Sequence, residues 1–177
     1  FLGHHSIGLE LLRDGSGMPD SISGAVESPD AELNRVIALV LEHARLRPDE
    51  SLMVVTASRK HAVRLQREVT TALRSRSDLV DFLVRDRAEP LLVATLEQAV
   101  EQSRDRVIFS IGYGRTPHGR LLSEFGALGG PEGERLLAVA MTRARRGMVI
   151  VSAFKPEHVE EHRMGRGVVL LAEILRE

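Results

Sequence analysis

Three arginines lie within four residues near the end of an apolar helical pattern, at Arg143, Arg145 and Arg146. A guanidinium keeps its positive charge at physiological pH, and its planar fork matches the oxygens of a phosphate. Held by a helix that packs on a sheet, such a group can stabilise the charge of a reacting phosphate. A solvated basic helix end is the alternative, because cations are also favoured near a helix C-terminus. The residue types and their spacing leave both interpretations open.

Other polar residues offer weaker chemistry. The glycine-rich stretch 112–119 follows an apolar strand pattern, but it does not open a helix as a dinucleotide fingerprint must. The sequence contains no phosphate loop of the form G-x-x-x-x-G-K-[ST]. For His4, His5 and His118 we expect exposed positions, with metal or phosphate contact as the alternative. Cysteine is absent, which excludes thiol catalysis and cysteine-ligated zinc, and we expect no metal site.

Composition limits the partners. The 177 residues are 43% hydrophobic and 28% charged, the balance of one globular domain. Lysine and arginine number 24 against 25 acidic residues, so any nucleic acid must meet a local basic patch or a partner domain. The low aromatic content of 3%, without tryptophan, argues against a base-stacking platform. We find no bilayer-spanning apolar run or signal pattern, and therefore expect a cytoplasmic location without a membrane partner.

Strand and helix patterns alternate along the chain. Apolar runs predict strands over 7–12, 52–56, 91–94, 106–111 and 148–152. Helical spacing predicts four helices: one capped by Ser28 that ends before Pro48, one capped by Ser58, one over 131–145 and one over 168–175. This alternation predicts an α/β fold with three α/β/α layers around a mainly parallel sheet. We expect an irregular lead-in with an edge strand over 1–27, a core over 28–155 and a helical segment of the same domain over 156–177.

Residues 133–145, G-E-R-L-L-A-V-A-M-T-R-A-R, resemble motif VI of superfamily 1 helicases, R-L-N-V-A-[LM]-T-R-A-R, which a buried strand follows. The preceding F-G-A-L at 125–128 is similar to the F-G-x-L element of many of these proteins. Residues 95–110 align without gaps with the motif V region, and residues 54–61 correspond to motif IV. The resemblance covers roughly residues 28–155, and motif VI is its specific part.

The resemblance implies the second, C-terminal RecA-like domain of a superfamily 1 helicase, from the branch related to RNA-surveillance DNA/RNA helicases. In that family two RecA-like domains clamp ATP with Mg²⁺ and grip single-stranded nucleic acid. The match makes Arg143 the arginine finger, aimed from its helix toward the carboxyl edge of the sheet, with Thr142 supporting its geometry. ATP and Mg²⁺ are expected only together with the N-terminal RecA-like domain of the same protein.

Further contacts follow from the same match. The residues implied at the nucleotide are Glu101, Gln102, Arg104 and Arg146, and those implied at the nucleic-acid backbone are Thr56, Arg59, Lys60 and Thr95. A solvated face is the alternative for Arg59 and Lys60, and ordinary surface pairing is the alternative for Arg104.

The sequence also departs from the family pattern. Val100 and Glu101 stand where motif V has Gln-Gly, His61 replaces the motif IV glutamine, and Ala138 replaces the motif VI asparagine. A glycine lets the backbone approach a phosphate, whereas Glu101 adds bulk and negative charge. Two functions stay open: a helicase motor domain that is inactive alone, and a degenerate RecA-like module that binds or assembles without catalysis. A Rossmann-type enzyme for small molecules lacks its fingerprint.

Overall fold

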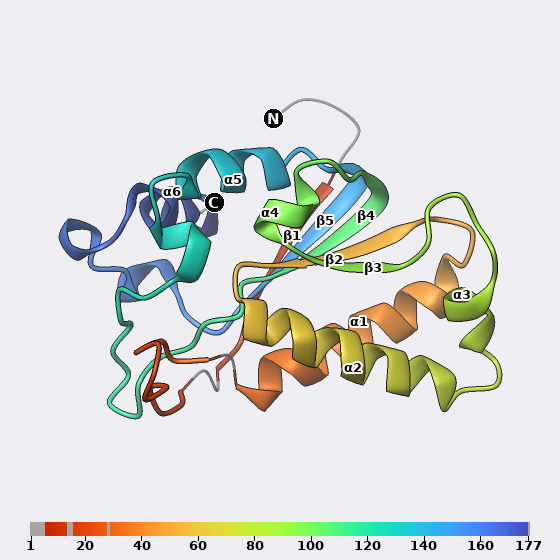
Figure 1. The fold of residues 1–177 in the computed structure, drawn as a ribbon, viewed down its shortest axis with the longest axis horizontal. Coiled ribbons are helices and arrows are strands. Elements are labelled where there is room, and N and C mark those ends of the chain that lie inside the picture. Colours follow the sequence, from red (N-terminus) through yellow and green to blue (C-terminus); the bar gives the residue numbers. More distant parts are fainter. Residues whose placement is uncertain (1–5, 14–15, 28, 177) are drawn as a thin grey trace.

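One parallel sheet organises the molecule. The computed structural model describes residues 6–13, 16–27 and 29–176. The strands are β1 (Ser6–Leu11), β2 (Leu52–Thr56), β3 (Leu92–Thr95), β4 (Arg104–Ser110) and β5 (Ala144–Ser152). Their order is β1-β5-β4-β2-β3, and every neighbouring pair is parallel (Figure 1). The predicted α/β class with a parallel sheet is therefore confirmed.

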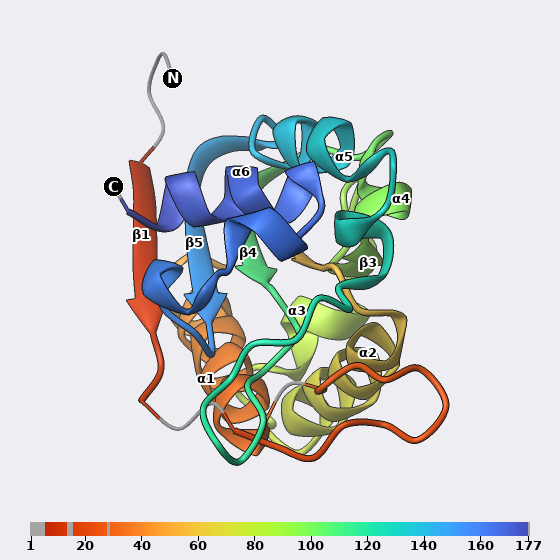
Figure 2. The same ribbon diagram turned by 90° about the vertical axis from the view of Figure 1, so that its left-hand side faces the viewer.

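Helices cover both faces of this sheet, which makes three layers (Figures 1 and 2). One face carries α1 (Asp30–Leu46), α2 (Arg59–Arg74) and the short α3 (Val80–Val84). The opposite face carries α4 (Leu96–Ala99), α5 (Gly133–Ala140) and α6 (Arg166–Leu175). Single 3₁₀ turns occupy Gly126–Gly129, Pro156–His158 and Glu161–Arg163. The short helices α3 and α4 were not predicted, because neither is long enough to show a helical period.

The two faces of the sheet hold two separate cores. Val54, Ile108 and Val151 pack against α1 and α2, and all three are almost fully buried. Phe109 and Ile150 point to the opposite face, where they pack against α5 and α6. This alternation explains the uninterrupted apolar runs of the sequence, because strands buried on both faces need apolar side chains at every position.

The start of α2 agrees with its sequence signal, whereas α1 begins one residue later than a cap at Ser28 predicts. Pro29 occupies the N-cap of α1, and its carbonyl accepts a hydrogen bond from the amide of Glu32 at 3.1 Å. The predicted cap Ser28 lies outside the described residues. Ser58 caps α2 as predicted, since its hydroxyl accepts from the amide of His61 at 3.1 Å.

The helix predicted over 131–145 is shorter than expected. α5 ends at Ala140, and β5 already begins at Ala144, four residues before the predicted strand start. The hydroxyl of Thr142 donates to the carbonyl of Val139 at 2.7 Å and closes a tight turn. The carbonyl of Arg143 then accepts from the amide of Arg104 at 3.1 Å, which draws the chain into the sheet. The helical placement of Thr142 and Arg143 was therefore wrong.

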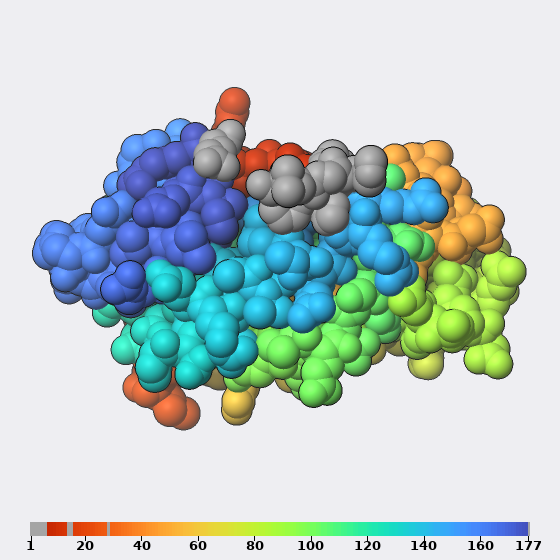
Figure 3. Space-filling model, turned by 90° about the horizontal axis from the view of Figure 1, so that it is seen from above, coloured from red at the N-terminus to blue at the C-terminus, as the bar shows by residue number. Residues whose placement is uncertain are grey.

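The predicted first strand exists and pairs with β5 at an edge of the sheet. Its side chains Ile7, Leu9 and Leu11 are about two-fifths exposed. On the sheet face opposite α1 and α2, α5 and α6 lie together at the molecular surface, where Figure 3 shows them in cyan and dark blue. Among the described residues, no helix is long and apolar enough to cross a membrane.

Candidate nucleotide and nucleic-acid sites

The implied site residues lie at two opposite edges of the sheet. In a parallel sheet all strands start at one edge and end at the other, so Thr56 and Thr95, the last residues of β2 and β3, mark the carboxyl edge. Arg104 starts β4, and Arg143 immediately precedes β5, so both lie at the amino edge. The expectation that Arg143 faces the carboxyl edge was wrong. The turn after α5 returns the chain to the start of β5, and Arg143 is part of that turn.

Arg143 combines a fixed backbone with an uncommitted side chain. Its amide donates to the carbonyl of Ala140 at 3.2 Å, and its carbonyl accepts from Arg104. The guanidinium forms no ion pair with any residue that the structure describes, and its buried Nε has no hydrogen-bond partner there. A guanidinium with unused donors, carried by a fixed backbone, is suited to binding an external anion.

The neighbouring arginines are paired, in contrast to Arg143. Arg145 donates from Nε to Asp105 Oδ1 at 3.0 Å and from Nη1 to Glu89 Oε2 at 3.0 Å. The hydrogen bonds that Arg145 donates to Glu89 and to Asp105 raise its pKa, and they outweigh the effect of burial, which lowers it. Arg146, an implied nucleotide contact, donates to Glu50 Oε1 at 3.2 Å. Both side chains thus contribute to a charged network at the amino edge.

Arg104 and Gln102, two further implied nucleotide contacts, bind each other. Arg104 is 6% exposed, and its Nη1 donates to Gln102 Oε1 at 3.1 Å and to the carbonyl of Ser103 at 2.9 Å. Its Nε donates to the carbonyl of Pro90 at 3.1 Å, and burial lowers its pKa. Glu101 is exposed and lines a shallow pocket between α4 and the start of α5. The Arg104 side chain therefore stabilises the start of β4 through its hydrogen bonds to the carbonyls of Pro90 and Ser103.

At the carboxyl edge, the two threonines implied at the nucleic acid form hydrogen bonds with backbone groups of this domain. Thr56 is fully buried, and its hydroxyl donates to the carbonyl of Ile111 at 3.3 Å. Gly112 approaches so closely that a Cβ there would lie 2.5 Å from Thr56 Oγ1, and its φ of +89° also favours glycine. Thr95 is 9% exposed and caps α4 in a reciprocal capping box with Gln98. In this conformation Thr56 cannot touch nucleic acid, which corrects the implied contact.

The exposed cations of this edge are Arg59 and Lys60, and each has an acidic partner. Arg59 Nη2 lies 3.5 Å from Glu97 Oε2, and Lys60 pairs with Asp20. Both cations line a pocket of about 430 Å³ to which Glu97 and two other glutamates also contribute. Burial raises the pKa of one of these, Glu27. Carboxylates so close to the cations weaken the attraction that this edge exerts on a phosphate backbone.

A buried polar cluster near this edge was not anticipated. Ser110 Oγ donates to Glu32, and the amide of Gly112 donates to Glu32 Oε2 at 2.9 Å. His61 Nε2 lies 2.8 Å from Ser110 Oγ. Because Ser110 gives its proton to Glu32, His61 must donate from Nε2. The three side chains are at most 1% exposed, and burial lowers the pKa of His61 to about 3.

This Glu32–His61–Ser110 cluster joins α1, α2 and β4 without being accessible to a substrate. It accounts for His61 at the motif IV position, where the side chain faces inward. The sequence offers one weak signal, a serine that directly follows the apolar residues 107–109 of β4. Glu32 carries no such signal, since an acidic residue in the first turn of a helix has an ordinary explanation.

Metal ligands do not cluster in the described part of the chain, where no group of three or more His, Asp or Glu side chains could hold an ion. His118 is exposed in the long loop. His4 and His5 lie outside the described residues.

Comparison with known proteins gives limited similarity. No protein-family model matches the chain, and no curated protein matches it. Among solved structures, it is similar to the C-terminal domain of a possible DNA helicase from Lactobacillus plantarum WCFS1. The two have 11% sequence identity and a TM-score of 0.43, and the match covers 94% of this chain and 80% of the other. The α/β assignment rests on the sheet order and the two helical layers described above.

Proposed function

We propose that this chain is the C-terminal motor domain of an ATP-dependent nucleic-acid helicase. It works with an N-terminal RecA-like domain of the same protein, which holds ATP and Mg²⁺. Arg143 supplies the positive charge that stabilises the γ-phosphate during hydrolysis, and Thr142 fixes the turn that carries it. The proposal is supported by the motif VI resemblance of residues 133–145.

The observation that carries this proposal is the uncommitted guanidinium of Arg143. Arg145 and Arg146 pair with carboxylates of their own domain, whereas Arg143 pairs with none that the structure describes. An arginine finger needs donors that are not used within its own domain, because only unused donors can bind the phosphate oxygens that gain charge in the transition state.

Nucleic acid is held at the other edge. Arg59 and Lys60 at the start of α2 are exposed and provide the charge, while Thr56 and Thr95 set the ends of the strands behind them. The nucleotide and the single-stranded nucleic acid thus contact different edges of one rigid sheet. The grip is sequence-independent and depends on salt.

The test is nucleic-acid-stimulated ATP hydrolysis by the complete protein. Arg143→Ala should lower the rate about 100-fold or more while nucleic-acid binding is retained, the scale expected when a transition-state charge is removed. Arg74→Ala is the matched control, because Arg74 is an exposed arginine without an ion pair in the described part of the chain. Hydrolysis that survives Arg143→Ala unchanged contradicts the finger role.

The second candidate is a degenerate RecA-like module that binds or assembles without catalysis. It is favoured by Glu101, an exposed carboxylate where motif V has a glycine. A negative charge there opposes the approach of a phosphate. Absence of ATP hydrolysis in the unmutated complete protein, with nucleic-acid binding intact, would select this candidate.

A further inference from the structure

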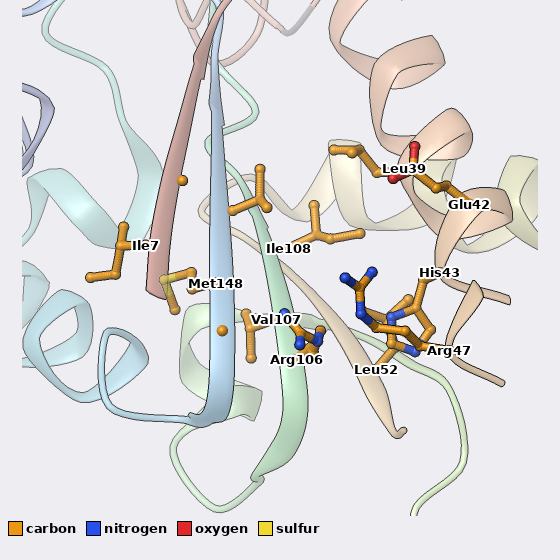
Figure 4. Close-up of a pocket in the computed structure, with 13 residues that line it drawn as sticks. Ile7, Leu39, Glu42, His43, Arg47, Leu52, Arg106, Val107, Ile108 and Met148 are labelled. Carbon is orange, nitrogen blue, oxygen red and sulfur yellow. The ribbon is translucent and has the colours of Figure 1, made fainter. Parts of the chain in front are cut away.

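A hollow lies between α1 and the sheet, and neither Arg143 nor the strand ends at the carboxyl edge line it. It has a volume of about 290 Å³, near the lower limit of small-molecule sites. Its floor is formed by β1, β5 and β4, and its far wall by the last two turns of α1 (Figure 4). Val149, Ile108 and Leu39 give it a largely apolar lining.

Two glycines in adjacent strands create the hollow. Gly8 of β1 and Gly147 of β5 both line it, and both have ordinary strand backbone without positive φ. A Cβ at Gly8 would meet its nearest atom, in Val149, at 3.7 Å, so neither strain nor crowding demands a glycine there. Glycine weakens a strand, and its presence often marks the close approach of a ligand.

Arginines with unused donors stand at one end of the hollow. Glu50 is shared by three guanidiniums: Arg106 Nε at 2.7 Å, Arg146 Nη1 at 3.2 Å and Arg47 Nε at 3.9 Å. One carboxylate cannot neutralise three cations, so this group of side chains keeps an excess of positive charge. The Arg47 guanidinium forms no hydrogen bond with the described residues, and the Arg106 guanidinium donates only from its Nε. Both arginines line the hollow.

The remaining polar groups leave this end positive. His43 Nε2 lies 2.8 Å from the carbonyl of Glu50, and burial lowers the pKa of His43, which keeps it neutral. Glu42 is exposed, and Figure 4 shows its carboxylate near Leu39, at the opposite end from Arg106. The same view shows the Arg47 guanidinium turned from the end of α1 toward the strands.

We propose that this hollow binds a small phosphate monoester, with the phosphate between Arg47 and Arg106 and an apolar body over Gly8 and Gly147. The excess of positive charge favours a phosphate dianion, and guanidinium forks match its oxygens. The flat glycine floor receives a planar or apolar group. This site is independent of the proposed helicase function, since Arg143 and the carboxyl edge do not line it.

Saturation-transfer NMR with phenyl phosphate as the probe tests the proposal on the unmodified protein. Phenyl phosphate should bind, while benzyl alcohol, which has the ring but no phosphate, and inorganic phosphate should each bind at least about tenfold more weakly, because each lacks one of the two interactions. Equal binding of benzyl alcohol overturns the proposed phosphate contact. Equal binding of inorganic phosphate overturns the proposed apolar contact.

Two pairs of variants locate the bound probe. Arg47→Ala should weaken phenyl phosphate about tenfold, whereas Arg45→Ala, an exposed arginine of the same helix turn, should leave it unchanged. Gly8→Val should abolish binding by filling the floor, whereas Leu9→Val on the opposite face of β1 should not. Unchanged binding in Arg47→Ala or in Gly8→Val overturns the proposal, as does absence of binding to the unmodified protein.

Discussion

His61 Nε2 lies 2.8 Å from Ser110 Oγ inside the protein, between the start of α2 and the end of β4. Ser110 in turn donates to Glu32, so one short chain of hydrogen bonds connects two helices to a strand. Buried polar groups are costly when unpaired, and such a cluster therefore favours one relative placement of these elements.

The stability of the protein should fall as the pH drops from 7.5 to 5.5. The pKa of His61 is about 3 in the folded protein and 6.5 in the unfolded chain. As the pH falls, the unfolded chain therefore takes up the proton before the folded protein does. The contribution of neutral, buried His61 to the free energy of unfolding is fully present above pH 6.5 and is lost progressively as the pH falls toward 3. The loss from this side chain should be about 1 kcal/mol over the stated interval. Urea unfolding at both pH values measures it.

His61→Gln provides the comparison for that measurement, since glutamine keeps a donor for Ser110 but does not titrate. The variant should lose about 1 kcal/mol less than the unmodified protein between pH 7.5 and 5.5. His43 and His158 also have lowered pKa values through burial, so some pH dependence should remain. An unchanged pH dependence in His61→Gln would show that this histidine titrates normally.

Ser110→Ala should destabilise the protein by about 1–3 kcal/mol, because it removes the hydroxyl that both Glu32 and His61 use. Chemical denaturation at neutral pH measures the change. Ser75→Ala is the control: its hydroxyl is exposed and bonds the carbonyl of Ala72, so the effect should stay within about 0.5 kcal/mol. Similar losses in the two variants would mean that the buried cluster adds no stability.

Gly133→Ala should prevent or severely impair folding. A Cβ at Gly133 would lie 1.9 Å from the carbonyl oxygen of Leu128, a backbone atom that cannot turn aside. The loss of stability should exceed that of a typical point mutation, about 1 kcal/mol. Gly130→Ala, whose added Cβ would meet Ala127 at an ordinary 3.5 Å, is the matched control. Thermal unfolding that is equally altered by both would contradict the packing described.

Glu97→Gln should strengthen binding of single-stranded nucleic acid by the complete protein about two- to fivefold at low salt. The change releases Arg59, whose guanidinium lies 3.5 Å from Glu97 Oε2. Fluorescence anisotropy over a salt series measures the affinity, and the gain should shrink as salt rises. The control is Glu173→Gln, an exposed glutamate on α6. An equal gain in the control would indicate an effect of net charge alone.

The sequence predicted the framework well because that framework depends on local pattern. Continuous apolar runs identified β2 and β4, and Ser58 marked the start of α2. The boundary between α5 and β5 was missed. Ala144 continues the apolar helical stripe and also starts the strand, so periodicity alone cannot separate the two.

The sites depended on contacts that sequence spacing does not contain. Glu32, His61 and Ser110 come together from elements 29 and 49 residues apart. The pairing of Arg145 with Glu89, and the lack of an ion pair at Arg143 among the described residues, are likewise set by the turn after α5. Motif resemblance could point to Arg143 but not to the edge at which it lies.

The pairing of β1 with β5 has a consequence for biosynthesis. Ile7 aligns with Met148, so the earliest described strand has no neighbour until about 140 further residues have been made. Strands that pair across such sequence separations form slowly, since a long loop must close first. During translation the backbone of β1 therefore stays without its partner strand, and the sheet is completed only after β5 has left the ribosome.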